Sequence, residues 1–273
     1  MLDFTVDQKL CTHCGLCVRD CPARIIAMAA GSLPRIEPDQ EAACLQCQHC
    51  LAICPAAAIE ILGRKPADSL PLASNSFPTL DRMELLLRGR RSVRQYRDEN
   101  VDPALLKRLL AAVANAPTGV NRRELTFTLI DDKDAMQRLR EKVLAGLDTA
   151  TRIPERYSYL HEAGKAYREH QNDIIFRTAP HALFVSAPPD APCPNQDIAI
   201  SLAYFELLAQ SAGLGTVWWG IAQMVFIVLP DLKALIGIPP KHLFYAMLFG
   251  MPAVKYPRTV QRDNAAVLRR AKI

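Results

Sequence analysis

Residues 11–22 read CTHCGLCVRDCP, and residues 44–55 read CLQCQHCLAICP. Both stretches follow the spacing C-x2-C-x2-C-x3-C-P. Gaps of two residues let one short loop wrap three thiolates around an inorganic cluster, and soft sulfur ligands suit iron. In such a paired run the fourth cysteine of each stretch ligates the other cluster. The repeat therefore predicts two 4Fe–4S clusters.

This crossed pairing divides eight cysteines into two predicted sets of four. One cluster would take Cys11, Cys14, Cys17 and Cys54, and the other would take Cys44, Cys47, Cys50 and Cys21. We expect each fourth cysteine to sit on the helix that follows its loop. Zinc sites generally pair two C-x2-C arms and do not use this triple spacing. A disulfide framework is disfavoured because eight of the nine cysteines lie before residue 55.

Residues 1–62 resemble a bacterial two-cluster ferredoxin, and the motifs span the whole stretch. The short apolar runs at 25–29 and 58–62 look like the strands that follow each motif. His13 and His49 each lie beside a predicted ligand cysteine, and we expect them to be surface residues. Cys193 lies in a proline-rich turn and is expected to be an ordinary free cysteine.

Composition and charge narrow the class of protein. The chain has 273 residues, half of them apolar, which is typical of globular domains. Residues 1–63 hold four basic and seven acidic residues, a net charge of −3, whereas the remainder carries +8. That basic excess includes no basic stripe with interleaved aromatic residues, so no nucleic-acid partner is predicted.

Neither export nor membrane insertion is predicted. The N-terminal stretch MLDFTVDQKL lacks a basic segment followed by an apolar core. The longest apolar run has 16 residues, at 214–229, and contains Gln223. A membrane span needs roughly 20 apolar residues. We therefore expect a cytoplasmic protein with no membrane partner.

A change of composition divides the chain. Residues 63–79 hold three prolines and three serines without periodicity, which predicts a linker between domains at 1–62 and 80–273. The second domain alternates helical and strand patterns, which indicates an α+β fold. Helices are predicted at 83–87, 102–115, 135–147 and 196–212, and strands at 125–131, 182–187 and 244–250. The helix at 196–212 is apolar nearly all round, which predicts a buried central helix or a subunit interface.

The stretch RGRRSVRQYRDEN at 88–100 is strongly basic, with five arginines within ten residues. Guanidinium groups bind phosphate through paired hydrogen bonds, and Ser92 adds a hydroxyl. Considered alone, the same stretch is also explained as a run of solvent-exposed charged residues without a ligand. The sequence contains no G-x-G-x-x-G or Walker motif, so a conventional nicotinamide-binding βαβ unit is not predicted.

Together with three motifs that follow it in the sequence, this stretch resembles the nitroreductase superfamily of FMN enzymes. The resemblance covers roughly residues 80–262 and rests on RRSVRQY, APTGVNR, GLGTVWWG and the basic stretch GMPAVKYPRTVQR. It implies a nitroreductase-like α+β FMN domain that forms an intertwined homodimer, with FMN at the interface. Taken alone, the tryptophan pair in GLGTVWWG is more often part of a core than of a cofactor site.

The resemblance also implies roles for individual residues. The flavin phosphate and the pyrimidine side of the ring would be held by Arg90, Arg91, Ser92 and Arg94. The next loop would line the flavin with Pro117, Thr118 and Asn121. The backbone of Trp219 and Gly220 would face the N5 edge, and Arg258 or, preferably, Arg262 would return to the phosphate. No catalytic side chain is assigned, because solvent can supply the protons.

The chain departs from this superfamily in one place. Many members have Gln-Pro-Trp shortly after the loop asparagine, whereas this chain has Arg123, Glu124 and Leu125. Arg123 is therefore a candidate for a salt bridge or for contact with an anionic substrate. Residues 151–177 have mixed polarity and form either a surface helix or the wall of a substrate pocket. The side chains that would line such a pocket are Tyr157, Tyr159, His161 and Tyr167.

Two functions are compatible with these motifs. In the first, electrons enter from reduced ferredoxin or NAD(P)H, and FMN reduces a small organic acceptor such as a nitroaromatic, a quinone or an activated double bond. A dedicated biosynthetic or dehalogenating reductase is a variant of this enzyme. In the second, the chain is an electron-transfer module that couples one- and two-electron carriers. The separate segment at 151–177, which can frame the flavin edge, favours the enzyme.

Overall fold

The computed structural model describes residues 2–150, 152–262 and 266–271. The chain divides into two compact units, one of Met1–Pro78 with Val120–Arg122 and one of Thr79–Gly119 with Arg123–Ile273. The predicted linker at 63–79 therefore groups almost entirely with the N-terminal unit, and it includes a short 3-10 turn at Pro66–Asp68. None of the helices in the described part of the chain has the length and apolar composition that a membrane span requires.

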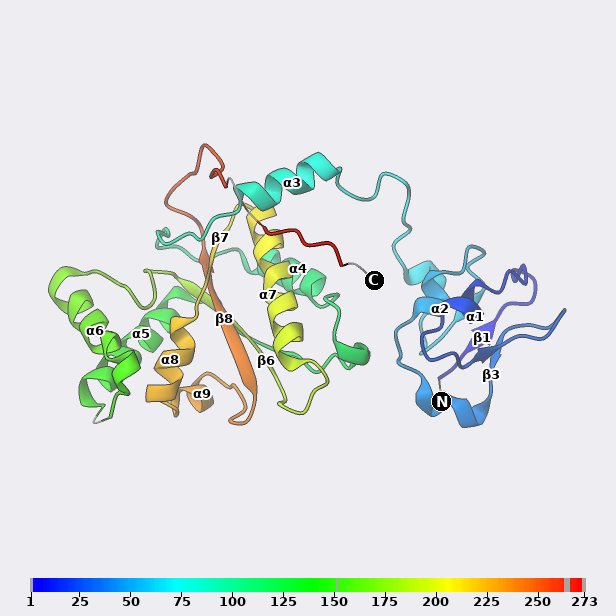
Figure 1. Cartoon of the computed structure of the whole chain (residues 1–273), viewed down its shortest axis with the longest axis horizontal. Coiled ribbons are helices and arrows are strands. Elements are labelled where there is room, and N and C mark those ends of the chain that lie inside the picture. Colours follow the sequence, from blue (N-terminus) through cyan, green and yellow to red (C-terminus); the bar gives the residue numbers. More distant parts are fainter. Residues whose placement is uncertain (1, 151, 263–265, 272–273) are drawn as a thin grey trace. The chain divides into compact units, whose positions relative to one another are not determined.

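The N-terminal unit is built from two small antiparallel pairs and two short helices (Figure 1). Strand β1 (Thr5–Val6) pairs with β4 (Ile59–Glu60), and β2 (Ile26–Ala27) pairs with β3 (Arg35–Ile36). Helices α1 (Leu16–Asp20) and α2 (His49–Ala52) each begin inside one cysteine stretch. The apolar runs at 25–29 and 58–62 contain β2 and β4, as the sequence predicted.

The second unit alternates helices with the strands of one sheet (Figure 1). Its helices are α3 (Leu80–Gly89), α4 (Pro103–Val113), α5 (Lys133–Thr149), α6 (Tyr159–His170), α7 (Pro194–Ser211), α8 (Ile221–Val228) and α9 (Leu232–Leu235). Its strands are β5 (Thr126–Ile130), β6 (His181–Ala187), β7 (Gly215–Trp218) and β8 (Leu243–Gly250). Each helix and strand predicted in this unit is present, and the ends differ by a few residues.

The sheet of the second unit separates two helical layers. Its strand order is β5-β6-β8-β7, with antiparallel neighbours throughout. Side chains alternate along β6, so that Ala182 and Phe184 pack in the layer of α5, α6 and α8. Leu183 and Val185 point the other way, into the layer of α4 and α7. Both faces of the sheet are therefore covered, which explains the continuous apolar run of β6.

The segment at 151–177 is mainly a surface helix. Tyr159 and His161 of α6 are exposed, whereas Tyr157 and Tyr167 pack partly against the core below. Helix α6 packs on α5, and an ion pair between Arg168 and Asp148 joins the two helices at 2.7 Å. The surface-helix interpretation therefore describes this segment better than a pocket wall built from all four side chains.

The basic stretch is attached to the open edge of the sheet at β7. Ser92 pairs with Thr216 in a parallel bridge, and the N–H of Val93 donates to the Thr216 carbonyl at 2.8 Å. Tyr96 is buried, which raises the pKa of its phenol, and its hydroxyl donates to the Val93 carbonyl at 2.8 Å. Because Gly215 has no Cβ, Val93 can pack directly on β7. The motifs RRSVRQY and GLGTVWWG thus lie side by side.

We expect Gly215→Ala to lower the free energy of unfolding by about 1–3 kcal/mol, because the new Cβ would overpack the site. It would lie 2.8 Å from the Val93 side chain. Adding Val93→Ala should recover part of the loss, so the two substitutions would be non-additive in urea unfolding. Gly89→Ala is the matched control, since its Cβ would meet no atom within 4 Å. Strict additivity of the Gly215 and Val93 substitutions would contradict this packing.

Candidate functional site

Eight cysteines line two small cavities in the N-terminal unit. One cavity, of about 20 Å³, contacts Cys11, Cys14, Cys17 and Cys54. The other, also of about 20 Å³, contacts Cys21, Cys44, Cys47 and Cys50. These are the two sets of four that the crossed pairing predicts. The structure brings the cysteines together in these sets, and their ligation of clusters is a proposal developed below.

The two cysteine loops repeat one backbone conformation. His13 and Gln46 lie at equivalent positions, with φ of 54° and 52°. Gly15 and Gln48 follow with φ of 67° and 60°, and each caps the helix that holds the third cysteine. Paired left-handed residues turn each loop tightly around its cavity. The loops are thus equivalent in structure as well as in spacing.

The fourth cysteines lie just beyond the helices and not on them, which corrects the prediction from sequence. Cys21 is the C-cap of α1, and Cys54 follows the C-cap of α2. Both helices are only four or five residues long, so the chain leaves the helix before it reaches the fourth cysteine. His13 and His49 are surface residues as expected, contacting the Ser32 carbonyl and Asp20 respectively.

The environments of the cysteines affect their pKa values in both directions. The pKa of Cys14 is lowered, chiefly by a hydrogen bond from the Leu16 backbone. Burial raises the pKa of the Cys50 thiol to about 11 and also raises the pKa of Cys17. Backbone N–H groups already point at sulfur, from Gln46 to Cys44 at 3.4 Å and from Ala58 to Cys54 at 3.3 Å. Such N–H···S contacts tune cluster potentials.

The four cysteines of each set surround a small cavity. Within the described ranges, no three His, Cys, Asp or Glu side chains lie close enough to hold one ion. The cysteines stand instead around a central space, as a polynuclear cluster requires. The donor set of four soft thiols per cavity fits iron–sulfur clusters.

Arginines from two distant parts of the second unit surround a larger cavity of about 450 Å³. Arg90 and Arg91 come from the segment after α3, and Arg262 comes from the C-terminal stretch. Arg88 also lines this cavity, although it was not predicted. Arg258 and Arg94 are not among the lining residues, and the Arg94 side chain donates to the Ser92 carbonyl at 3.4 Å. Several guanidinium groups around one space form a suitable environment for a phosphate.

A buried carboxylate holds this basic segment in place. Glu206 of α7 accepts from the Arg90 guanidinium at 3.0 Å and from the Trp218 indole N–H at 3.2 Å. The Thr216 hydroxyl lies 3.5 Å from the same carboxylate. Glu206 is only 7% exposed. One side chain of the central helix therefore joins the arginine stretch to strand β7.

A second buried carboxylate holds the loop of residues 116–119. Both oxygens of Asp197, at the start of α7, accept from the Gly119 N–H at 3.0 and 3.2 Å. Gly119 lies so close to Cys193 that a Cβ would be 3.1 Å from its sulfur. Pro117 and Thr118 are thereby fixed beside the start of α7.

Asn121 groups with the N-terminal unit, where its amide donates to the Leu45 carbonyl at 2.8 Å.

Trp219 is a core residue, and it is held by both its backbone and its side chain. The Trp219 N–H donates to the Ala246 carbonyl and its indole N–H donates to the Ile175 carbonyl, both at 2.8 Å. At Gly220 a Cβ would lie 2.8 Å from the Tyr245 hydroxyl. A side chain at this position would therefore displace the Tyr245 hydroxyl.

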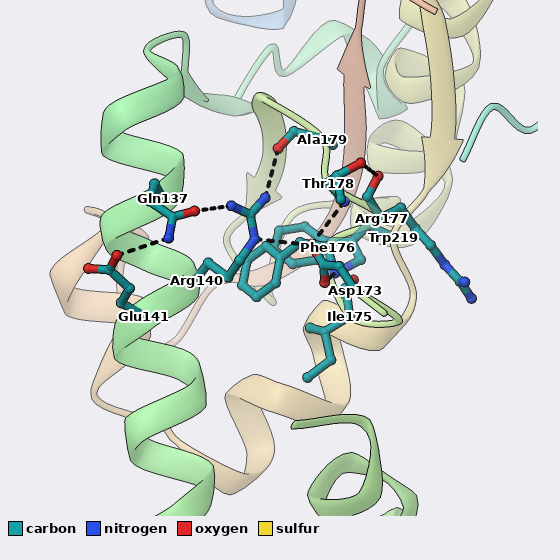
Figure 2. A network of polar contacts seen from close by, with 10 residues as sticks. All are labelled: Gln137, Arg140, Glu141, Asp173, Ile175, Phe176, Arg177, Thr178, Ala179 and Trp219. Carbon is teal, nitrogen blue, oxygen red and sulfur yellow. Dashed lines mark hydrogen bonds and ion pairs between the residues drawn. The ribbon is translucent and has the colours of Figure 1, made fainter. Parts of the chain in front are cut away.

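The turn at residues 173–179, which contacts the Trp219 indole, is fixed by a buried ion pair between Arg140 of α5 and Asp173 (Figure 2). The two groups are 3.0 Å apart, and Asp173 also accepts from the N–H groups of Phe176 and Thr178. Figure 2 shows the Arg140 guanidinium reaching on to Gln137 and to the Ala179 carbonyl. This network shapes the turn whose Ile175 carbonyl receives the Trp219 indole.

The sequence did not identify Glu206, Asp197 or Asp173. A signal was available in α7, because two acidic residues interrupt a helix that is otherwise apolar nearly all round. Buried carboxylates in such a position need partners, so they indicate a polar contact with another segment. Nothing in the local sequence indicates which segment that is.

Comparison with known proteins agrees with this architecture. Residues 87–251 match the nitroreductase family, and residues 10–59 match the 4Fe-4S dicluster domain. The first match covers more than half of the chain, so the chain belongs to the nitroreductase family. With its N-terminal 4Fe–4S domain it is, by class, an iron–sulfur flavoprotein oxidoreductase.

Individual relatives are distant. A Methanothermobacter thermautotrophicus protein named NADH dehydrogenase/NAD(P)H nitroreductase is 24% identical over 181 residues, which cover 64% of this chain and 80% of the relative. Two solved nitroreductases with bound FMN, from Bacteroides fragilis and Desulfitobacterium hafniense, are 21% and 20% identical. Each has a TM-score of 0.56 and covers 70% of this chain and 100% of its own. These similarities confirm the predicted nitroreductase-like α+β fold.

We expect Asp173→Ala to lower the free energy of unfolding by about 3–5 kcal/mol, because it leaves the buried Arg140 charge without its partner. The measurement is urea unfolding followed by tryptophan fluorescence, which also reports the surroundings of Trp219. Glu169→Ala is the matched control, since Glu169 pairs with Lys165 on the surface at 4.0 Å. That variant should change stability by less than about 0.5 kcal/mol. Equal losses in the two variants would contradict the role of the network.

Proposed function

We propose that electrons pass from two 4Fe–4S clusters to FMN, which reduces a small organic acceptor. The observation that carries this proposal is the combination, in one chain, of two four-cysteine cavities with an arginine-lined cavity in a nitroreductase fold. The clusters supply single electrons, and FMN can take these one at a time and pass two on as hydride. The acceptor would be a nitroaromatic, a quinone or an activated double bond.

The second unit contains suitable groups for FMN. Arg90, Arg91 and Arg262 would bind the phosphate, because their guanidinium groups line one cavity. Glu206 would keep Arg90 in position through the 3.0 Å contact. The loop with Pro117 and Thr118, fixed by Asp197, would contact the flavin ring, and the Trp219–Gly220 backbone would face its N5 edge. Solvent would supply protons.

A homodimer is part of this proposal. Helix α3 buries none of its residues within the single chain, and Leu80, Leu85 and Leu87 are each more than half exposed. Tyr204 of α7 is also exposed. A helix whose exposed side includes three leucines is expected to pack against a partner. Asp197 and Glu206 lie nine residues apart on α7, or about 13 Å. In a dimer, the loop from one chain and the arginines from the other could meet at one flavin.

Reduced ferredoxin and NAD(P)H are the proposed donors. The N-terminal 4Fe–4S domain favours entry of single electrons from a reduced ferredoxin. The relative named an NAD(P)H nitroreductase favours direct reduction of the flavin by a nicotinamide. The alternative function is an electron-transfer module that has no small-molecule substrate of its own. Slow turnover with every acceptor, despite fast flavin reduction, would favour that alternative.

The double variant Arg90→Ala with Arg91→Ala should purify with its iron and without flavin, because the phosphate loses two of its guanidinium partners. Flavin content is measured by absorbance after denaturation. Arg97→Ala is the control from the same segment, since Arg97 is exposed and lies 3.6 Å from Glu99. It should retain flavin fully. Full flavin occupancy in the double variant would refute the phosphate site.

Cys50→Ser should reduce the iron content from about eight to about four per chain, because one of two 4Fe–4S clusters loses a ligand. Cys21→Ser should remove the same cluster, as judged by electron paramagnetic resonance of the reduced protein. Cys54→Ser should remove the other, and Cys193→Ser should remove neither. Under anaerobic conditions, reduced ferredoxin should bleach the flavin more slowly in the Cys50 variant than in the parent. Equal bleaching rates would place electron entry at the flavin itself.

A further inference from the structure

A third cavity in the second unit lies next to the loop that Asp197 holds. Its volume is about 190 Å³. Ala116, Leu125 and Phe127 contribute apolar walls, and Thr118, Arg123 and Ser201 contribute the polar groups. Arg123 is the residue at which the chain departs from the nitroreductase pattern. The cavity is separate from the arginine-lined cavity, with which it shares no lining residue.

Ser201 is one of the residues that line this space, and its hydroxyl is unused. It lies on α7 and is 0% exposed, and its Oγ has no hydrogen-bond partner among the residues described. Leaving a buried hydroxyl unpaired costs about 1–3 kcal/mol. Serine in a helix can usually bond to the carbonyl four residues earlier, but Ser201 does not. A group that reaches this hydroxyl from the cavity would therefore satisfy it.

Arg123 places a positive charge at the same cavity. Its side chain is exposed, and it forms no ion pair within the described part of the chain. Its backbone has φ of 54°, and its N–H donates to the Thr118 hydroxyl at 3.0 Å. That bond holds the residue in a left-handed conformation and occupies Thr118 as an acceptor. The Thr118 hydroxyl keeps its own proton, so the cavity offers a guanidinium and the hydroxyls of Ser201 and Thr118 as donors.

The neighbouring negative charge does not compete for these donors. Asp197 lies one helical turn before Ser201, and both of its carboxylate oxygens accept from the Gly119 N–H. Asp197 is not among the residues that line the cavity. A cavity with apolar walls, several donors and one positive charge selects an organic anion. The planar fork of a guanidinium matches a carboxylate.

We propose that this cavity binds the carboxylate of an unsaturated or aromatic acid, and that this acid is the acceptor reduced at the flavin. Arg123 pairs with the carboxylate, Ser201 donates to it, and the hydrocarbon part of the acid packs on Leu125 and Phe127. The assignment as an acceptor rests on the function proposed above, because Thr118 of the same cavity belongs to the loop expected to line FMN. Binding of the carboxylate is independent of that function.

The test is calorimetric titration of the purified full-length protein with benzoate, and with benzamide as the neutral analogue of the same shape. Benzoate should bind the parent at least tenfold more tightly than benzamide does. Arg123→Gln should weaken benzoate binding about tenfold, the size expected for a hydrogen bond to a charged group, and leave benzamide binding unchanged. Arg123→Lys should retain part of the affinity. Arg108→Gln, an exposed arginine of α4, is the matched control and should change neither.

Ser201→Ala is a second, conservative variant, and it should weaken benzoate binding severalfold at unchanged flavin content and at a thermal stability equal to or above that of the parent, because the unpaired hydroxyl is removed. Equal affinity of the parent for benzoate and benzamide would overturn the proposal. Unchanged benzoate binding in Arg123→Gln would also overturn it. Competition by inorganic phosphate as strong as that by benzoate would show a general anion site and would overturn the assignment to an organic acid.

Steady-state reduction of 4-nitrobenzoate and 4-nitrobenzamide separates this inference from the proposed function. The KM for 4-nitrobenzoate should rise about tenfold in Arg123→Gln at constant kcat, and the values for 4-nitrobenzamide should not change. A preparation without FMN would refute the proposed function, whereas the benzoate titration would still decide whether the carboxylate site exists. A flavin-loaded enzyme that reduces both nitro compounds equally well, with no effect of Arg123→Gln, would refute only the inference.

Discussion

The second unit depends on carboxylates buried along one central helix. Glu206 of α7 joins Arg90 to Thr216 and Trp218, and Asp197 of the same helix joins the loop at Gly119. Burying a carboxylate costs free energy unless it is paired, so the fold must bring a hydrogen-bond donor to each one. Three motifs that are far apart in the sequence are thereby attached to a single rigid element. The helix acts as a scaffold for the candidate flavin site.

The sheet supplies the rest of the framework. Strands β6 and β8 are covered on both faces, which leaves the edge at β7 to receive the basic stretch after α3. Gly215 permits that contact, and the buried pair of Arg140 and Asp173 stabilises the turn behind Trp219. The segment after α3 is thus held by strand pairing and by close packing on Gly215, and the turn near Trp219 is held by the buried ion pair.

The N-terminal unit is organised differently. Its strands have only two residues each and its core is small, so the chain around the cysteines has few other contacts to hold it. Two equivalent loops with left-handed residues bring the cysteines into their sets. A small unit of this kind commonly relies on a metal site for stability. Cluster binding and folding are therefore expected to be coupled here.

Sequence alone determined much of this protein. The spacing of the cysteines determined both sets of four, and apolar periodicity located every helix and strand predicted in the second unit, because both signals are local. Tertiary structure decided that Arg262 and not Arg258 lines one cavity with Arg90 and Arg91, and that Cys21 and Cys54 lie beyond their helices. It also decided that Glu206 holds Arg90 and that Asp197 holds Gly119. These outcomes depend on which distant segments meet in space, and no local pattern of residues records that.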